Sequence, residues 1–120
     1  MTLKLNTRLM EGVTVVDCHG RIIFGDESAM LRETIKELLK TSKDIVINLA
    51  DVNYIDSGGL GTLVGLFTSA RSIGGTIKLA NLTHRVTELL QVTKLLTVFE
   101  VYDGEDKAVR SFSTKKGAVA

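Results

Sequence analysis

A glycine-rich segment with one serine is the part of this 120-residue sequence whose residue types and spacing best suit chemistry. Its residues are Asp56, Ser57, Gly58, Gly59, Leu60 and Gly61. Aspartate and serine are preferred at helix N-caps, and glycines ease a tight turn from a strand into a helix. Three glycines at a helix start also cost stability, about 1 kcal/mol each relative to alanine. Because a plain turn seldom needs all three, the segment indicates a place where another backbone or a bulky group comes close.

Ser57 stands at the expected first turn of a helix within this segment. The free backbone N–H groups of such a turn, together with the positive end of the helix dipole, favour an anion. A phosphate on Ser57 would carry a charge of about −1.5 to −2 and would meet that positive end. The residues alone therefore make Ser57 a candidate for a regulated site.

Other catalytic and ligand-binding patterns are missing or incomplete. Neither G-x-x-x-x-G-K-[ST] nor G-x-G-x-x-G occurs. His19 and His84 lie far apart in the sequence, and neither has carboxylates or thiols at metal-ligand spacing. Ser57 could belong to a Ser-His-Asp triad on paper, but Ile55 replaces the first glycine of the G-x-S-x-G elbow. A receiver-like phosphoacceptor would need a pair of acidic residues at strand ends, and that pair is absent here. From these missing patterns together, we expect no metal, no cofactor and no hydrolase activity.

The composition is that of an ordinary globular domain, with 44% hydrophobic and 24% charged residues. Lys and Arg number 15 against 14 Asp and Glu, a balance that offers no general attraction to nucleic acid or to an anionic membrane. The sole cysteine, Cys18, excludes an intramolecular disulfide, and its apolar surroundings in the sequence predict a buried free thiol. No signal-peptide pattern or membrane-spanning run is visible, so we expect a cytoplasmic protein.

Two strands are predicted before the first helix. Residues 3–10 alternate as a half-buried strand does, and the expected inward face consists of Leu3, Leu5, Thr7 and Leu9. Glu11–Gly12 predicts a tight turn into a second strand at residues 13–19, so the two strands form a hairpin. Gly20 is expected to end the second strand, and residues 21–24 form a short apolar extension.

Strands and helices alternate in the rest of the chain. Asp26 is predicted to cap a helix whose inner face is Leu31, Ile35, Leu38 and Leu39. Residues 44–50 predict a strand buried on both faces, and residues 51–55 a loop that leads into Ser57. A second helix begins at Asp56–Ser57 and ends at Gly74–Gly75, with an expected buried face of Leu60, Leu63, Val64, Phe67 and Ala70.

Further strands are predicted at residues 76–80 and 98–102, with a helix capped by Thr83 between them. A final short helix carries Ala108, Val109 and Phe112, and residues 113–120 are expected to fray. A helix between two buried strands implies a crossover and parallel pairing. The expected fold is therefore α/β in one domain, 1–120 with a core of about 3–112: a mixed sheet of four to five strands, begun by a hairpin and flanked by about four helices.

The stretch Asn48–Gly61, NLADVNYIDSGGLG, resembles the signature of the STAS domain, the module of anti-sigma factor antagonists and of sulfate-transporter tails. The whole chain is similar to that domain in length and element order, from about Leu3 to Phe112. The resemblance implies a sheet of four or five strands flanked by helices and no catalytic activity of the domain's own. It also implies that Ser57, the serine directly after the aspartate, is phosphorylated by an ATP-dependent anti-sigma factor kinase.

Partner switching is the cycle that this resemblance implies. The unphosphorylated antagonist binds the anti-sigma factor, which releases its sigma factor; the phosphorylated antagonist cannot bind, and a phosphatase resets it. The candidate partner-binding residues are Asp26, Asp56, Ser57, Gly58, Gly59, Leu60 and Gly61. The alternative is a STAS module that serves as a scaffold or as a transport-system subunit, with Ser57 unmodified.

Two positions differ from the common motif of these antagonists. Gly58 stands where the motif has a second serine or threonine. The loop Gly20–Asp26 lacks the frequent Gly-Glu-Leu-Asp pattern, and Ile23 falls where an acidic residue is usual. If that acidic residue engages the kinase, its role is either absent here or taken by Asp26.

Overall fold

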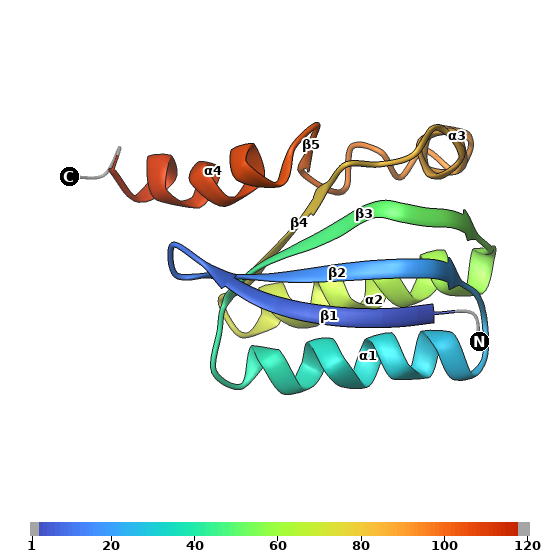
Figure 1. The fold of residues 1–120 in the computed structure, drawn as a ribbon, viewed down its shortest axis with the longest axis horizontal. Coiled ribbons are helices and arrows are strands. Elements are labelled where there is room, and N and C mark those ends of the chain that lie inside the picture. Colours follow the sequence, from blue (N-terminus) through green and yellow to red (C-terminus); the bar gives the residue numbers. More distant parts are fainter. Residues whose placement is uncertain (1–2, 118–120) are drawn as a thin grey trace.

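The structure, a computed structural model, describes residues 3–117, with side chains as far as residue 113. Within these residues, five strands form one sheet in the order β1-β2-β3-β4-β5 (Figure 1). The strands are β1 Leu3–Met10, β2 Val13–Ile22, β3 Asp44–Ile55, β4 Thr76–Ala80 and β5 Val101–Tyr102. The helices are α1 Asp26–Leu39, α2 Ser57–Ser72, α3 His84–Val92 and α4 Glu105–Gly117. Since β1 and β2 are antiparallel and all other neighbours are parallel, the predicted mixed α/β fold is confirmed.

The hairpin forms as the sequence predicts. Glu11 and Gly12 have φ values of 50° and 83°, and two successive left-handed residues are typical of a type I′ hairpin turn. Leu9, predicted for the inward face, is nevertheless 75% exposed. It lies beside the turn, where the hairpin extends past α1 and α2 (Figure 1), so no helix covers it.

Strands β2 and β3 are both longer than predicted. Gly20 does not end β2; it has a φ of 118° inside the strand, and the pairing with β3 shifts register before it and directly after it. A glycine with positive φ at such a shift is a β-bulge, which bends a strand without ending it. The predicted loop 51–55 is the continuation of β3, because these residues pair with the end of β2 and bury Val52 and Ile55.

Helices cover both faces of the sheet (Figure 1). Helices α1 and α2 pack on one face, and α3 adds Val86 and Leu90 to the same core. Leu66 of α2 is buried although it was not among the predicted core residues, whereas Val64 and Phe67 are only half-buried. Helix α4 packs on the opposite face with a smaller cluster: Val13, Val15, Val46, Ala80, Ala108, Val109 and Phe112. Cys18 is buried as predicted, and burial raises the pKa of its thiol to about 12.

A half-buried polar network joins α4 to the sheet. The guanidinium of Arg8 donates to Asp17 Oδ2 at 2.7 Å and Oδ1 at 2.9 Å, and to Glu105 Oε1 at 2.7 Å. Asn48 Nδ2 donates to Asp17 Oδ1 at 2.9 Å and to Glu105 Oε1 at 3.3 Å. The network therefore links side chains from β1, β2, β3 and the first turn of α4.

The C-terminal elements differ from their predicted lengths. β5 contains only Val101–Tyr102 of the strand predicted at 98–102. Helix α4 continues through residues 113–117, which we expected to fray, and residues 118–120 lie outside the described part of the chain. Among the described residues, no helix has both the length and the apolar character that a bilayer span requires.

Candidate functional site

Ser57 is the first residue of α2, and of the two candidate caps, aspartate and serine, it is Asp56 that caps the helix. Asp56 has an extended backbone, and its Oδ1 accepts a hydrogen bond from Gly59 N at 2.7 Å. Bonds from backbone N–H groups, first that of Gly59 and then that of Phe24, hold the pKa of the Asp56 carboxyl below its usual value. The carboxylate is therefore charged at neutral pH and stabilises the helix start next to Ser57.

The same carboxylate also holds the loop between β2 and α1, residues 23–25. Phe24 N donates to both carboxylate oxygens of Asp56, at 3.2 and 3.1 Å. The backbone N–H of Asp56 donates in return to Ile22 O at 3.3 Å. Asp56 thus fixes two segments relative to each other that are 32 residues apart in the sequence.

Asp26 is not the cap of α1, contrary to the prediction. The N-cap is Gly25, with a φ of 111° and no side-chain cap, and Asp26 is the first helical residue. In place of a capping side chain, the carbonyl oxygen of Ile23 accepts from the N–H of Ser28 at 3.1 Å, and it also accepts from the Ser28 hydroxyl at 2.7 Å. Asp26 is exposed on the first turn of α1, directly after the loop that Asp56 holds.

The three glycines of the segment have different surroundings. A Cβ on Gly59 would lie 2.0 Å from Ile22 O, and one on Gly58 would lie 2.6 Å from Phe24 Cβ. A Cβ on Gly61 would meet nothing within 4 Å. At Gly58 and Gly59, therefore, the segment that comes close is the end of β2 and the loop after it. Of the three glycines, only Gly61 borders open space.

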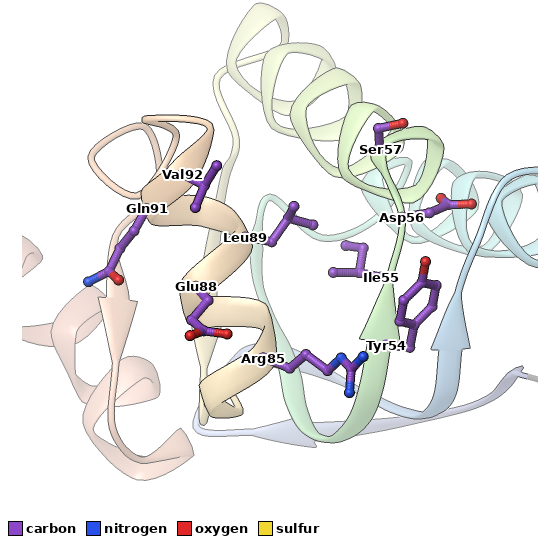
Figure 2. Close-up of a pocket in the computed structure, with 9 residues that line it drawn as sticks. All are labelled: Tyr54, Ile55, Asp56, Ser57, Arg85, Glu88, Leu89, Gln91 and Val92. Atoms are coloured by element: carbon purple, nitrogen blue, oxygen red, sulfur yellow. The ribbon is translucent and has the colours of Figure 1, made fainter.

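Ser57 lies in a groove of about 740 Å³ between the end of β3, the start of α2 and helix α3 (Figure 2). The groove is lined by Tyr54, Ile55, Asp56, Ser57, Arg85, Glu88, Leu89, Gln91 and Val92. Ser57 is exposed, and within the described residues its hydroxyl forms no hydrogen bond. A hydroxyl in this position is accessible to a modifying enzyme without any unfolding of the domain.

Some of the candidate partner-binding residues are accessible and others are buried. Gly59 and Leu60 are buried, so they support the site from within the domain. The sequence did not single out the groove residues Arg85 and Val92 on α3, nor Phe24. The Arg85 Cζ atom lies 5.6 Å from the centre of the Tyr54 ring. This contact joins α3 to β3, and no local pattern in the sequence predicts it. Among the described residues, no group of three or more His, Cys, Asp or Glu side chains gathers as a metal site would require.

Comparisons with known proteins agree with this fold. The family model of the STAS domain matches residues 4–108. The chain is 39% identical over 101 residues to the anti-sigma-B factor antagonist of Bacillus subtilis (strain 168), covering 84% of this chain and 92% of that protein.

Two solved structures share the fold at lower identity. The anti-sigma factor antagonist SpoIIAA in its unphosphorylated form matches with a TM-score of 0.76 at 17% identity, covering 94% of this chain and 97% of that one. The Bacillus cell fate determinant SpoIIAA in its phosphorylated form matches with a TM-score of 0.70 at 17% identity, covering 92% and 99%. The fold, the family match and the similarity to a curated antagonist lead to one conclusion: this chain belongs to the STAS domain family of anti-sigma factor antagonists.

Proposed function

We propose that this chain binds an anti-sigma factor with serine kinase activity through the surface around Ser57, and that phosphorylation of Ser57 ends that binding. The anti-sigma factor releases its sigma factor while it is bound here, and a phosphatase restores the binding form of the antagonist. In this role the chain is a regulator of transcription in the bacterial cytoplasm and has no catalytic activity of its own.

The observation that carries the proposal is the exposed, unbonded hydroxyl of Ser57 at the first position of a 16-residue helix. A phosphate there lies at the positive end of the helix dipole, which tolerates a new anion. Hydrogen bonds hold the residues around it, because Asp56 bonds both to the first turn of α2 and to the loop between β2 and α1. SpoIIAA shares this fold, and its two structures are named for an unphosphorylated and a phosphorylated form, which supports a phosphorylation cycle for this chain.

The effect of the phosphate should fall on the partner and not on the fold. The phosphate would add about −1.5 to −2 charge units and bulk to an exposed surface, while the buried residues beneath it, Gly59 and Leu60, stay in place. Asp56 already places one negative charge next to it, so phosphorylation concentrates negative charge on one small area. A partner that fits the neutral hydroxyl then meets both steric and electrostatic repulsion.

The test is to incubate the purified chain with ATP and each kinase-type anti-sigma factor of its source organism. Intact-mass measurement followed by peptide mapping should find one added phosphate, on Ser57. No phosphate with any of these kinases, or a phosphate on another residue, would contradict the proposal and would favour a scaffold or transport-system role.

Variants at residue 57 separate binding from modification. Ser57→Ala should bind the anti-sigma factor as the unmodified chain does but accept no phosphate. Ser57→Asp should lose affinity for the anti-sigma factor while its Tm stays within a few degrees, about 1 kcal/mol or less. A large drop in the Tm of Ser57→Asp would mean that the added charge acts by unfolding the domain.

A further inference from the structure

Phe24 is a large aromatic side chain that the fold holds in solvent. It is 80% exposed, although both neighbouring parts of its loop are fixed. Its N–H donates to Asp56, and the carbonyl before it, Ile23 O, accepts two bonds from Ser28. A single exposed apolar residue is common on protein surfaces, but this one is presented by a bonded loop beside Ser57.

Phe24 and Gly58 form a matched pair. The Phe24 Cβ lies where a Cβ on residue 58 would be only 2.6 Å away, so the ring can lie over α2 only because residue 58 is glycine. Gly58 replaces the serine or threonine of the common motif, and in this chain Phe24 occupies the space beside it. Together the two residues form an aromatic projection next to the site of modification.

A groove of about 320 Å³ extends from Phe24 between α1 and α2. Its remaining lining residues are Arg32, Lys36, Gly58, Gly61, Thr62, Gly65, Leu66 and Ser69. Both charged side chains in this lining are cationic, and no acidic residue lines the groove. Arg32 and Lys36 are exposed and belong to none of the ion pairs found among the described residues; the ion pair on α1 is Glu37–Lys40.

We propose that this groove is a docking surface for the anti-sigma factor, which contributes an apolar pocket for Phe24 and a carboxylate-bearing segment that lies against Arg32 and Lys36. The proposal rests on the proposed function. The charge of the groove indicates an acidic partner segment, because its two unpaired cations have no anion beside them in the lining. The open space above Gly61 and Gly65, where a Cβ would meet nothing within 4 Å, leaves room for its backbone.

This surface also explains why a phosphate on Ser57 would release the partner. Gly58 lines this groove, whereas the adjacent Ser57 lines the groove between β3, α2 and α3, so the first turn of α2 separates the two grooves. A partner that extends from the Phe24 groove across this turn would cover Ser57. The phosphate would then add negative charge and bulk beside a partner whose docking segment carries carboxylates. Like charges at an interface repel, and release follows without any change in the fold of the antagonist.

The experiment measures the Kd of the anti-sigma factor that binds the unmodified chain. Phe24→Ala should weaken binding at least about tenfold, as truncation of a central aromatic anchor does. The matched control is Leu9→Ala, which removes an equally exposed apolar side chain at the far end of the hairpin and should leave the Kd unchanged.

The cationic half of the proposal has its own readout. The double variant Arg32→Gln and Lys36→Gln should weaken binding and reduce the dependence of the Kd on salt, because it removes charges that salt screens. The control is Lys107→Gln with Arg110→Gln on α4, which should change neither. Circular dichroism melts of all four variants should agree within a few degrees, since none of these side chains is buried.

The outcomes distinguish the two proposals. If no anti-sigma factor of the source organism binds the unmodified chain, the proposed function is wrong and this docking surface is wrong with it. If one binds but Phe24→Ala and the double variant bind as tightly as the unmodified chain, the docking surface alone is overturned. Loss of affinity in Gly65→Ala, whose new methyl group meets nothing in the chain, would support the groove directly.

Discussion

Among the residues that the structure describes, two aspartates have a lowered pKa, and they lie in different parts of the domain. Asp17 lies in the half-buried network under α4, where its main partner is the guanidinium of Arg8. Asp56 lies at the surface beside Ser57, where its partners are backbone N–H groups. A buried carboxylate needs a charged partner to offset its desolvation, whereas an exposed one does not.

The bonds of Asp17 stabilise the fold, whereas those of Asp56 position exposed side chains. The network around Asp17 joins four elements through side chains, so removal of one member leaves other charges buried without a partner. Asp56 joins two backbone segments and leaves the side chains of Ser57 and Phe24 exposed for other molecules. We expect changes around Asp17 to affect unfolding most, and changes around Asp56 to affect binding most.

The largest effect on stability is expected for Arg8→Met. It would leave Asp17 and Glu105 as two carboxylates in one half-buried site, and the free energy of unfolding should fall by about 2–4 kcal/mol. Arg110→Met is the control, because it removes only an exposed ion pair with Asp106 and should cost less than about 1 kcal/mol. Urea titration measures both. Equal costs would remove the distinction between the network and the surface.

A somewhat smaller effect is expected from alanine at the helix start. Gly59→Ala would place a Cβ 2.0 Å from the backbone oxygen of Ile22, and we expect a loss of about 1–3 kcal/mol. Gly61→Ala meets nothing and should stabilise the helix by up to about 1 kcal/mol. Thermal melts of the two variants compare them directly; a stabilised Gly59→Ala would mean that β2 and α2 are not as close as the structure has them.

Asp56→Ala should cost about 0.5–2 kcal/mol, the range for loss of an N-cap. Its more specific result is local: the amide of Phe24 loses its acceptor and should exchange with solvent faster, while the amides of the core strands keep their protection. Hydrogen exchange followed by mass spectrometry measures this. Unchanged exchange of the loop would show that Asp56 does not hold it.

The smallest effect is the contribution of each carboxylate to acid sensitivity. Both folded-state pKa values are lowered, so each group stabilises the fold above its unfolded pKa, about 4, and this stability is lost as the pH falls through the folded value. Asp17→Asn should flatten the decline in stability between about pH 5 and pH 2 more than Asp56→Asn does, because Asp17 loses an interaction with a charged partner. If Asp56→Asn flattened the decline more than Asp17→Asn, the expected order of the two carboxylates would be wrong.

Periodicity predicted most elements correctly because each forms from its own residues. The turn at Glu11–Gly12, the strand Thr76–Ala80, the helix start at Asp56–Ser57 and the cap at Thr83 are all where the sequence places them. The errors in β2 and β3 occur where strand pairing overrides a local signal. Gly20 and the polar residues after Ala50 indicate breaks, but the pairing of β2 with β3 continues through both.

Lys78 is a further case in which tertiary contacts decide. A lysine in a strand is expected at the surface, yet its side chain is 2% exposed. Its Nζ donates to Ser111 Oγ at 2.6 Å, lies 3.3 Å from Glu100 Oε1 and lies 4.1 Å from the centre of the Phe112 ring. These partners come from other segments, so burial of Lys78 becomes possible only after α4 has packed on the sheet.

The local sequence places Ser57 at the start of a helix, because the first turn of a helix depends on neighbouring residues. It also determined the order of strands and helices, which follows from local periodicity. Three features near Ser57 depend instead on the packing of distant segments: the bond of Asp56 to Phe24, the place of the Phe24 ring beside Gly58, and the two cations of α1 that line the adjoining groove. Those contacts join residues about thirty positions apart, and side chains so distant in sequence meet only when the sheet and its helices are assembled.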